Sequence, residues 1–331
     1  MIGENKRFSD IYYIRKIINI FRTIKLKKQW YCIKDGVSES IKKDCIIYCA
    51  DGHIAHGGLA DRMYGLMAIY ALCKMQHVPF YIFWDTPYDL SLFLVPNKYD
   101  WCIKKSQIIY DKRLSVPRCL LGGAMRLPKN AIRIKKRKQV HVYCNFKNLS
   151  FITKKYETDI SYKALFKELF KFSPAFSETL ADYKAMLPTE YSGLQVRVLN
   201  AFGDFPDSVD NTLTYEEQDS LIDLCCNKIK QIYNETSQSV LFTSDSQILI
   251  DNVKKKLGAN DILVTIPGEI THTDSCTKQN ESPYELHKKT FIDLFLLSDS
   301  ANLYQICDEH IYKSGFSILA AKISGKEVQF I

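Results

Sequence analysis

Short apolar runs alternate with helical segments in both halves of the chain, and this alternation limits the possible folds more than any other feature. In the first half, Leu59–Met75 has helical periodicity and lies between two apolar runs, Cys45–Gly52 and Val78–Asp85. The second half repeats the pattern, with strands expected at 192–200, 239–245, 261–267 and 302–307 and helices at 215–236, 246–258 and 285–298. Strands that alternate with helices form parallel sheets. The predicted fold class is α/β, with two Rossmann-like parallel-sheet domains facing a cleft.

The same pattern predicts the domain boundaries. The helical segment Tyr162–Met186 is expected to connect the halves, with Pro174 starting a new helical segment. We expect a basic amphipathic leader, an N-terminal α/β domain and a C-terminal α/β domain, over residues 1–44, 45–185 and 186–331.

The leader interleaves apolar and basic residues between Ile11 and Ile33. A helix with this pattern can lie on an anionic membrane surface. It can equally be a basic helix packed on its own domain, and the sequence leaves both interpretations open.

Composition narrows the class of protein. Charged residues make up 25% and hydrophobic residues 46% of the chain, as in ordinary globular proteins, and the net charge of +8 favours anionic ligands. The eleven cysteines include no CxxC pair and are interpreted as reduced thiols. The sequence shows neither a membrane-spanning run nor a signal peptide, which predicts a cytoplasmic protein.

The segment from Lys98 to Lys138 is strongly basic, with thirteen Lys or Arg residues against Asp100 and Asp111. Its weak periodicity predicts irregular structure, apart from a short strand at Val140–Tyr143. A nucleic-acid-binding protein is therefore an alternative, but no known nucleic-acid-binding signature accompanies the run. A non-catalytic membrane adaptor is a second alternative.

The first motif is HGGLADR, which runs from His56 to Arg62 between a predicted strand and a predicted helix. Gly57 and Gly58 permit close backbone approach, and Arg62 adds a positive charge beside the helix N-terminus. These features suit an anionic or sugar ligand. A simple tight turn is the alternative, and neither a Walker loop nor a GxGxxG fingerprint is present.

The second motif is LQVRVLNAFGDFPD, in which Arg197 lies in an apolar run that leads to Gly203 and Asp204. An arginine in such a strand needs a partner, and phosphate binds a guanidinium in a bidentate way. The alternative partner is Asp204 or Asp245, in a structural salt bridge.

Two further motifs place hydroxyl groups at predicted helix starts. In the first, LFTSDS, they can cap the helix or hold a nucleotide. In the second, Asp293 lies in a helix and is followed by KSGFS, where hydroxyl and N–H groups suit a phosphate. The residues in question are Thr243, Ser244, Asp245, Ser246, Ser314, Gly315, Phe316 and Ser317.

In this order the motifs resemble those of bacterial α-1,2-fucosyltransferases and nodulation α-1,6-fucosyltransferases, over roughly residues 45–325. HGGLADRMYGL resembles their glycine motif, and QVRVLNAFGDF resembles a divergent HxRRGD motif with Arg197 at the first arginine. LFTSDSQILIDNVKKKL is similar to their FSDD segment, and the C-terminal Asp-helix and SGFS turn follow their pattern. Gln195 and Val198 depart from the motif, as does the longer spacing before Gly203 and Asp204.

The resemblance implies a GT-B-like fold and an inverting, metal-independent glycosyltransferase, divergent in sequence, that uses a nucleotide sugar, GDP-fucose or another. It implies that the C-terminal domain holds the donor and the N-terminal domain the glycan acceptor. Arg197 and Arg62 would stabilise the leaving diphosphate. Asp61, His56 and Asp204 are the candidate bases, without a ranking.

The resemblance implies no cofactor besides the donor and no metal, and the sequence has no DxD motif at a strand end. His53 and His56 do not predict a metal pair, because no third ligand lies nearby in the sequence. The natural setting of such an enzyme is bacterial capsule or lipopolysaccharide synthesis, peripheral at the inner membrane.

Overall fold

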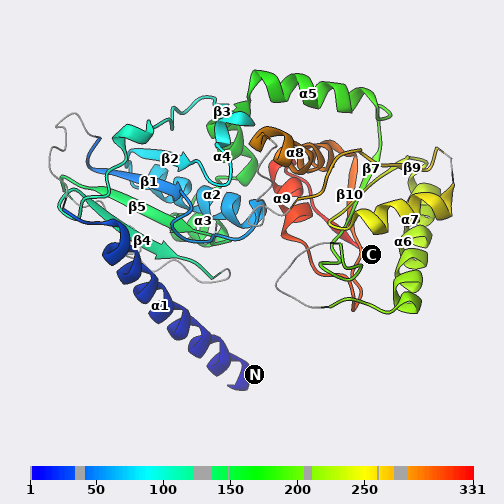
Figure 1. Cartoon of the computed structure of the whole chain (residues 1–331), viewed down its shortest axis with the longest axis horizontal. Coiled ribbons are helices and arrows are strands. Elements are labelled where there is room, and N and C mark those ends of the chain that lie inside the picture. The colour runs from blue at the N-terminus through cyan, green and yellow to red at the C-terminus, as the bar shows by residue number, and fades with distance from the viewer. Residues whose placement is uncertain are drawn as a thin grey trace. The chain divides into compact units, whose positions relative to one another are not determined.

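The structure is a computed structural model of the 331-residue chain, and it describes residues 2–33, 42–122, 136–147, 149–204, 211–258, 261–271 and 282–331, with side chains from residue 14 onward. The chain divides into two compact units (Figure 1). Unit 1 comprises Met1–Leu90 with Val95–Lys171, and unit 2 comprises Ser91–Leu94 with Phe172–Ile331. The division near residue 171 lies earlier in the chain than the expected boundary at 185, and the leader belongs to unit 1.

Unit 1 is built on a four-stranded sheet in the order β2-β1-β5-β4, in which every pair is parallel. Its strands are β1 (Cys45–Ala50), β2 (Phe80–Trp84), β4 (Ser115–Leu120) and β5 (Gln139–Cys144). The expected strands at 45–52, 78–85 and 140–143 are present. β4 was not expected, because its sequence SVPRCL contains a proline and an arginine; as an edge strand, it tolerates the missing N–H of Pro117.

One face of this sheet is covered by helices, as the βαβ pattern predicts. The central helix α2 (Leu59–Met75) packs against α3 (Leu149–Lys155), α4 (Tyr162–Leu169) and the sheet. Gly65 makes this packing possible, because a Cβ built on it would lie only 1.9 Å from the carbonyl oxygen of Cys144 on β5. The helix can therefore approach β5 this closely only with glycine at that position.

The opposite face of the sheet packs against the C-terminal part of α1 (Ile2–Trp30) and against the segment after β2, which contains the short helix η2 (Lys105–Gln107). Leu26 of α1 is buried there with Ile47, Phe83 and Tyr143. Within the described part of the chain, no helix has the length and apolar character that crossing a membrane requires.

Unit 2 is built on a five-stranded parallel sheet in the order β11-β10-β7-β8-β9. Its strands are β7 (Ser192–Val196), β8 (Val240–Ser244), β9 (Leu263–Val264), β10 (Asn302–Gln305) and β11 (Gln329–Phe330). Its main helices are α6 (Tyr215–Thr236), α7 (Gln247–Leu257), α8 (Pro283–Asp299) and α9 (Gly315–Ser324). The expected strand–helix alternation is confirmed, with β11 as an additional strand.

The two faces of the unit 2 sheet carry different helices. Leu194, Val196 and Phe242 point into a core built with α6 and α7. Successive side chains of a strand point to opposite faces, so the residues between them face α8 and α9. Gly193 confirms this direction, because a Cβ on it would contact Leu297 of α8.

The helical segment expected over Tyr162–Met186 forms two helices, with a short strand between them. The short strand β6 (Phe170–Phe172) separates α4 from α5 (Pro174–Ala185) and pairs with β3 (Leu94–Pro96), next to the 3-10 helix η1 (Leu90–Leu92). Ser173 caps α5, because its hydroxyl accepts a hydrogen bond from the Phe176 amide, and Pro174 occupies the first turn. A new helical segment therefore starts at Pro174, as expected.

Candidate functional site

Three neighbouring strands of unit 2 end at one edge of the sheet, and one of the last two residues of each strand places a polar side chain there. Gln195 on β7 is paired in register with Gln305 on β10 and with Thr243 on β8. All three face α8 and α9, because their neighbours along each strand point into the core on the other face. We call Gln305, Gln195 and Thr243 the polar row.

The polar row is buried but incompletely hydrogen-bonded. Gln305 donates to the carbonyl of Tyr312 at 3.1 Å and accepts from the Ser317 hydroxyl at 3.3 Å. By contrast, the Gln195 Oε1 and the Thr243 Oγ1 have no hydrogen-bond partner among the described residues, although these residues are only 5% and 2% exposed. Buried polar atoms without partners are costly. The row therefore has hydrogen-bonding capacity that a polar ligand can use.

Asp293 adds a buried charge to the same side of the sheet. It lies on α8, forms an ion pair with Lys289 one turn earlier, and is 6% exposed. Its Oδ1 has no hydrogen-bond partner in the described part of the chain. Burial raises the pKa of Asp293 above its ordinary value, and Lys289 opposes that rise. Asp293 was expected to contact the nucleotide.

Arg197 does not lie within a strand, as the sequence suggested, but immediately after the end of β7. Its side chain is 34% exposed, and its Nε lies 3.8 Å from the Asp245 Oδ2. Of the two expected structural partners, Asp245 lies beside Arg197. The expectation of a buried strand arginine was wrong because the chain leaves the sheet at Val196.

The Asp245 carboxylate ends β7 by accepting hydrogen bonds from the backbone amides that follow this strand. The carboxylate accepts hydrogen bonds from the amides of Val198 at 2.8 Å and Leu199 at 3.1 Å, and Leu199 adopts a positive φ of 53°. Burial raises the pKa of Asp245 to about 6, although the two amides and Arg197 oppose the increase. Asp245 therefore holds the turn that positions Arg197.

The start of α7 confirms the capping interpretation of LFTSDS for Ser246. The Ser246 hydroxyl accepts a hydrogen bond from the Leu249 amide at 3.0 Å. Asp204 supports the same turn, because its Oδ2 accepts from the Ser246 hydroxyl at 3.0 Å and from the Ile248 amide at 2.9 Å. Ser244 also acts locally, accepting from the Ser246 amide at 3.2 Å.

The start of α9 lies next to the polar row. Ser314 is fully buried, and its hydroxyl accepts a hydrogen bond from the Phe316 amide at 3.1 Å. Ser317 joins the helix to the row through Gln305. The amide of Tyr312 donates to the carbonyl of Arg197 at 2.8 Å, so the segment before α9 is tied to the end of β7. The structure thus brings the second, third and fourth motifs to one edge of the unit 2 sheet.

The glycine motif lies in unit 1, at the start of α2. Gly57 has a positive φ of 85°, and Gly58 precedes the first helical residue. Arg62 is buried and donates to the carbonyls of Gly57 and Thr86, each at 2.9 Å, while it packs over the Trp84 ring. These contacts show that Arg62 holds the glycine turn against the chain after β2.

The three candidate bases have different surroundings. His56 is 1% exposed, and its Nδ1 lies 3.0 Å from the carbonyl oxygen of Ile54. The Asp204 carboxylate accepts hydrogen bonds from Ser246 and Ile248 at the start of α7. Asp61, in the first turn of α2, is 39% exposed, and its carboxylate lies 3.5 Å from the Lys147 ammonium. Asp61 is therefore the candidate that solvent reaches most readily.

Sequence reasoning missed a buried network at the end of β1. The Asp51 Oδ2 accepts from the Tyr110 hydroxyl at 2.6 Å and the Tyr143 hydroxyl at 2.8 Å, and lies 3.1 Å from the His53 Nδ1. Burial would raise the pKa of Asp51, but these contacts outweigh it and lower the pKa to about 2. The sequence contains a feature that could have predicted this network, because Asp51 directly follows a strand of six apolar residues.

Among the described residues, no group of three or more His, Cys, Asp or Glu side chains has the arrangement of a metal site. In particular, His53 contacts Asp51 and stacks on Trp30 with ring centroids 3.9 Å apart.

No protein-family model and no curated protein sequence matches the chain. Solved structures do match. An Arabidopsis thaliana FUT1 variant in complex with GDP aligns with a TM-score of 0.53 at 12% identity, over 92% of this chain and 73% of that one. The α-1,6-fucosyltransferase NodZ, soaked with GDP-fucose, aligns with a TM-score of 0.51 at 12% identity, over 85% and 93%. The fucosyltransferase NodZ from Bradyrhizobium aligns with a TM-score of 0.51 at 14% identity, over 84% of this chain and 92% of that one.

The chain has the fold of these fucosyltransferases. The predicted GT-B-like α/β class and the resemblance stated from the motifs are thereby confirmed at the level of the fold. Gln195, Gln305 and Lys289 were not among the predicted site residues. A glutamine between apolar strand residues was a visible signal, but the pairing of the three strands that aligns the row was not.

The unsatisfied hydroxyl of Thr243 makes a prediction about stability. Thr243→Val replaces it with a methyl group of similar size, so the free energy of unfolding of the ligand-free protein should rise by about 1 kcal/mol. Thr23→Val is the matched control, because the Thr23 hydroxyl accepts from the Cys119 amide at 3.2 Å. The free energy of unfolding of Thr23→Val should fall by about 1 kcal/mol. Urea unfolding measures both; a loss of stability in Thr243→Val would contradict the assignment.

The Asp51 network predicts a pH dependence. The folded pKa of about 2 lies below the ordinary value of 3.8, so the network stabilises the fold above pH 4 and loses this contribution as the pH falls from 4 towards 2. Asp51→Asn should lower the free energy of unfolding by about 2 kcal/mol at pH 7, and the difference from the parent should vanish near pH 2. Asp182→Asn, an exposed control, should differ little at any pH. A difference that stays constant with pH would refute the assignment.

Proposed function

We propose that the protein is an inverting, metal-independent glycosyltransferase that transfers fucose from GDP-fucose, or the sugar of another nucleotide donor, to a glycan acceptor. The fold supports this proposal, because it is shared with fucosyltransferases whose structures contain GDP or GDP-fucose. The edge of the unit 2 sheet supports it further, because it offers a guanidinium, a helix N-terminus and buried polar atoms together.

The observation that carries the proposal is the position of Arg197. Its half-buried guanidinium follows the central strand β7, at the carboxyl edge where parallel sheets bind ligands. The N-terminus of α9 is tied to the same strand end through Tyr312. A diphosphate bound there would meet the positive charge of Arg197 and the positive end of the α9 helix dipole.

The remaining unit 2 residues would contact the nucleoside part of the donor. Thr243 and Gln195 carry the unsatisfied polar atoms of the row, and Asp293 carries one more. Ser244 and Asp245 shape the turn between the strands, while Ser314 and Ser317 fix the start of α9. In this assignment most of the predicted hydroxyl residues position the site and Thr243 contacts the donor directly.

The chemistry follows from these groups. An acceptor hydroxyl attacks the anomeric carbon of the sugar, forming a new carbon–oxygen bond while the bond to the diphosphate breaks. The diphosphate leaves with the bonding electron pair, and Arg197 stabilises the negative charge that develops on it. The proton of the acceptor hydroxyl passes to a carboxylate.

We assign the base role to Asp61, because it is more accessible than His56 and is not engaged in helix capping as Asp204 is. Unit 1 is then the acceptor side, with the turn at Gly57 and Gly58 beside the base. Such an enzyme would act in bacterial capsule or lipopolysaccharide synthesis, on acceptors held at the inner face of the membrane.

Nucleotide binding is tested by calorimetry without added divalent cation. GDP should bind more tightly than UDP, and Thr243→Val should weaken GDP binding about five- to ten-fold while the protein remains at least as stable as the parent. Binding that requires Mg²⁺ or Mn²⁺ would refute the metal-independent assignment, and unchanged affinity in Thr243→Val would remove that residue from the donor site.

The role of Arg197 is tested by turnover with a panel of sugar nucleotides. Arg197→Ala should lower the rate by roughly 10² to 10³, equivalent to about 3 to 4 kcal/mol, because the lost contact strengthens as the diphosphate departs. Arg197→Lys keeps the charge without the bidentate geometry and should recover part of the rate.

Folding must be measured beside the rate, because Arg197→Ala also leaves the Asp245 carboxylate without its ion-pair partner. Melting curves of both variants and of Lys228→Ala, a charge removal elsewhere in unit 2, supply that control. Near-parent turnover in both arginine variants, with parent-like melting, would show that Arg197 does not bind the diphosphate.

A further inference from the structure

Helix α1 has one face that is firmly attached to unit 1. Asn19 pairs with the backbone of Leu121, donating to its carbonyl at 2.9 Å and accepting from its amide at 3.1 Å. Thr23 accepts from the Cys119 amide, and Leu26 is 2% exposed in the core. These contacts fix the rotation of the helix against the edge strand β4.

The opposite face of α1 is apolar and exposed. At 100° per residue, positions 14, 17, 21 and 24 lie roughly opposite 19, 23 and 26. Phe21 is 66% exposed, Ile14 56% and Ile17 51%. Among the side chains that the structure describes, from residue 14 onward, the exposed large apolar residues on this face are Ile14, Ile17, Ile18, Ile20, Phe21 and Ile24. The attached face points inward, so this apolar face is not part of the core of unit 1.

The charge around this face is of one sign. Residues 11–33 contain six Lys or Arg residues and no Asp or Glu. Arg22, Lys25 and Lys28 are exposed beside the apolar residues. A partner that covers this face must therefore offer both an apolar interior and negative charge.

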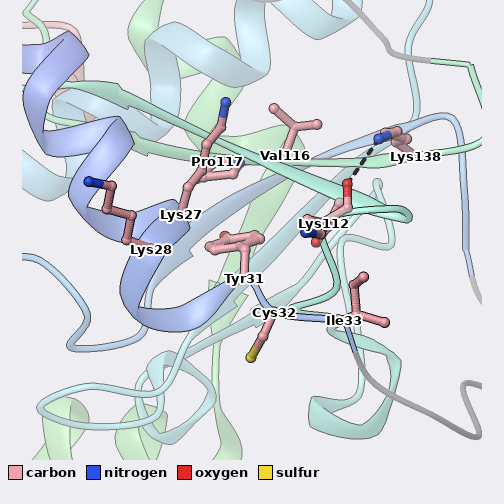
Figure 2. A pocket seen from close by; sticks show the side chains of 10 residues that line it. Lys27, Lys28, Tyr31, Cys32, Ile33, Lys112, Val116, Pro117 and Lys138 are labelled. Atoms are coloured by element: carbon pink, nitrogen blue, oxygen red, sulfur yellow. Dashed lines mark hydrogen bonds between the residues drawn. The ribbon is translucent and has the colours of Figure 1, made fainter.

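A pocket of about 660 Å³ lies at the carboxyl end of α1 (Figure 2). Four lysines line it, namely Lys27, Lys28, Lys112 and Lys138. Val116 and Pro117 of β4 supply an apolar wall. The ring of Tyr31 also lines it, while the Tyr31 hydroxyl lies 2.8 Å from the His141 Nδ1. A phosphate with an attached apolar chain matches this lining.

We propose that the exposed face of α1 and the lysine pocket form a docking surface for a bilayer rich in anionic phospholipid. The helix lies in the interface with its apolar residues among the acyl chains, and the pocket takes a lipid phosphate. A second copy of the chain fits less well, because two α1 faces that carry Lys and Arg but no Asp or Glu would then lie against each other. The inference rests on α1 and β4 and not on the nucleotide site, although it supplies the membrane partner that the proposed function expects.

The test is flotation of the full chain with vesicles of phosphatidylcholine, with and without phosphatidylglycerol. Binding should require the anionic lipid and weaken in 0.5 M salt. Neutralising Lys28 and Lys112 with Gln should reduce partitioning about five-fold for each lysine, whereas Lys163→Gln with Lys230→Gln should leave it unchanged. Phe21→Ser should reduce partitioning at least about ten-fold, and Tyr215→Ser, an exposed aromatic in unit 2, should not.

Three results would contradict the proposal that this surface docks on a bilayer. Equal binding to neutral vesicles, or loss of binding with millimolar glycerol phosphate, would overturn the bilayer assignment. A parent dimer that Phe21→Ser converts to a monomer, seen by light scattering, would make a second copy the occupant. Melting curves and GDP calorimetry on the same variants separate these results from misfolding and from failure of the proposed function, since none of the variants touches unit 2 except the controls.

Discussion

The carboxylate of Asp245 organises the edge of the unit 2 sheet on which the proposed chemistry depends. It draws the amides after β7 away from strand pairing and so ends the central strand at Val196. Arg197 consequently leaves the sheet at its carboxyl edge, and its carbonyl accepts a hydrogen bond from the Tyr312 amide before α9. One buried acid thus connects the ends of β8 and β7 with the start of α9.

The polar row, like Asp245, buries polar atoms at a cost in free energy. A domain of this size normally satisfies the polar atoms between a sheet and its helices. Here Gln195, Thr243 and Asp293 each keep a buried oxygen without a partner among the described residues, within one layer of the fold. Concentrated unsatisfied groups of this kind are typical of a site whose hydrogen bonds are completed by a ligand.

Most of the architecture could be predicted from the sequence, because hydrophobic periodicity reports which faces of the elements are buried. The βαβ unit of unit 1 and the alternation in unit 2 follow from it directly. β4 could not be predicted, since an edge strand with Pro117 and Arg118 lacks that periodicity. The end of β7 could not be predicted either, because Asp245, nearly fifty residues later, decides it. The register that aligns Gln195 with Thr243 and Gln305 is likewise a property of strand pairing, which a single sequence does not contain.

The attachment of α1 to β4 has a consequence for the solubility of the protein. Asn19 and Thr23 occupy backbone groups of Leu121 and Cys119, at the end of the edge strand β4. In other sheets an edge strand is kept from pairing with foreign strands by charge or by short length. The leader therefore shields the sheet of unit 1 from edge-to-edge association. A chain shortened by this helix would expose an unpaired strand, so aggregation of such a truncated protein would reflect an uncovered sheet edge and not the loss of a partner.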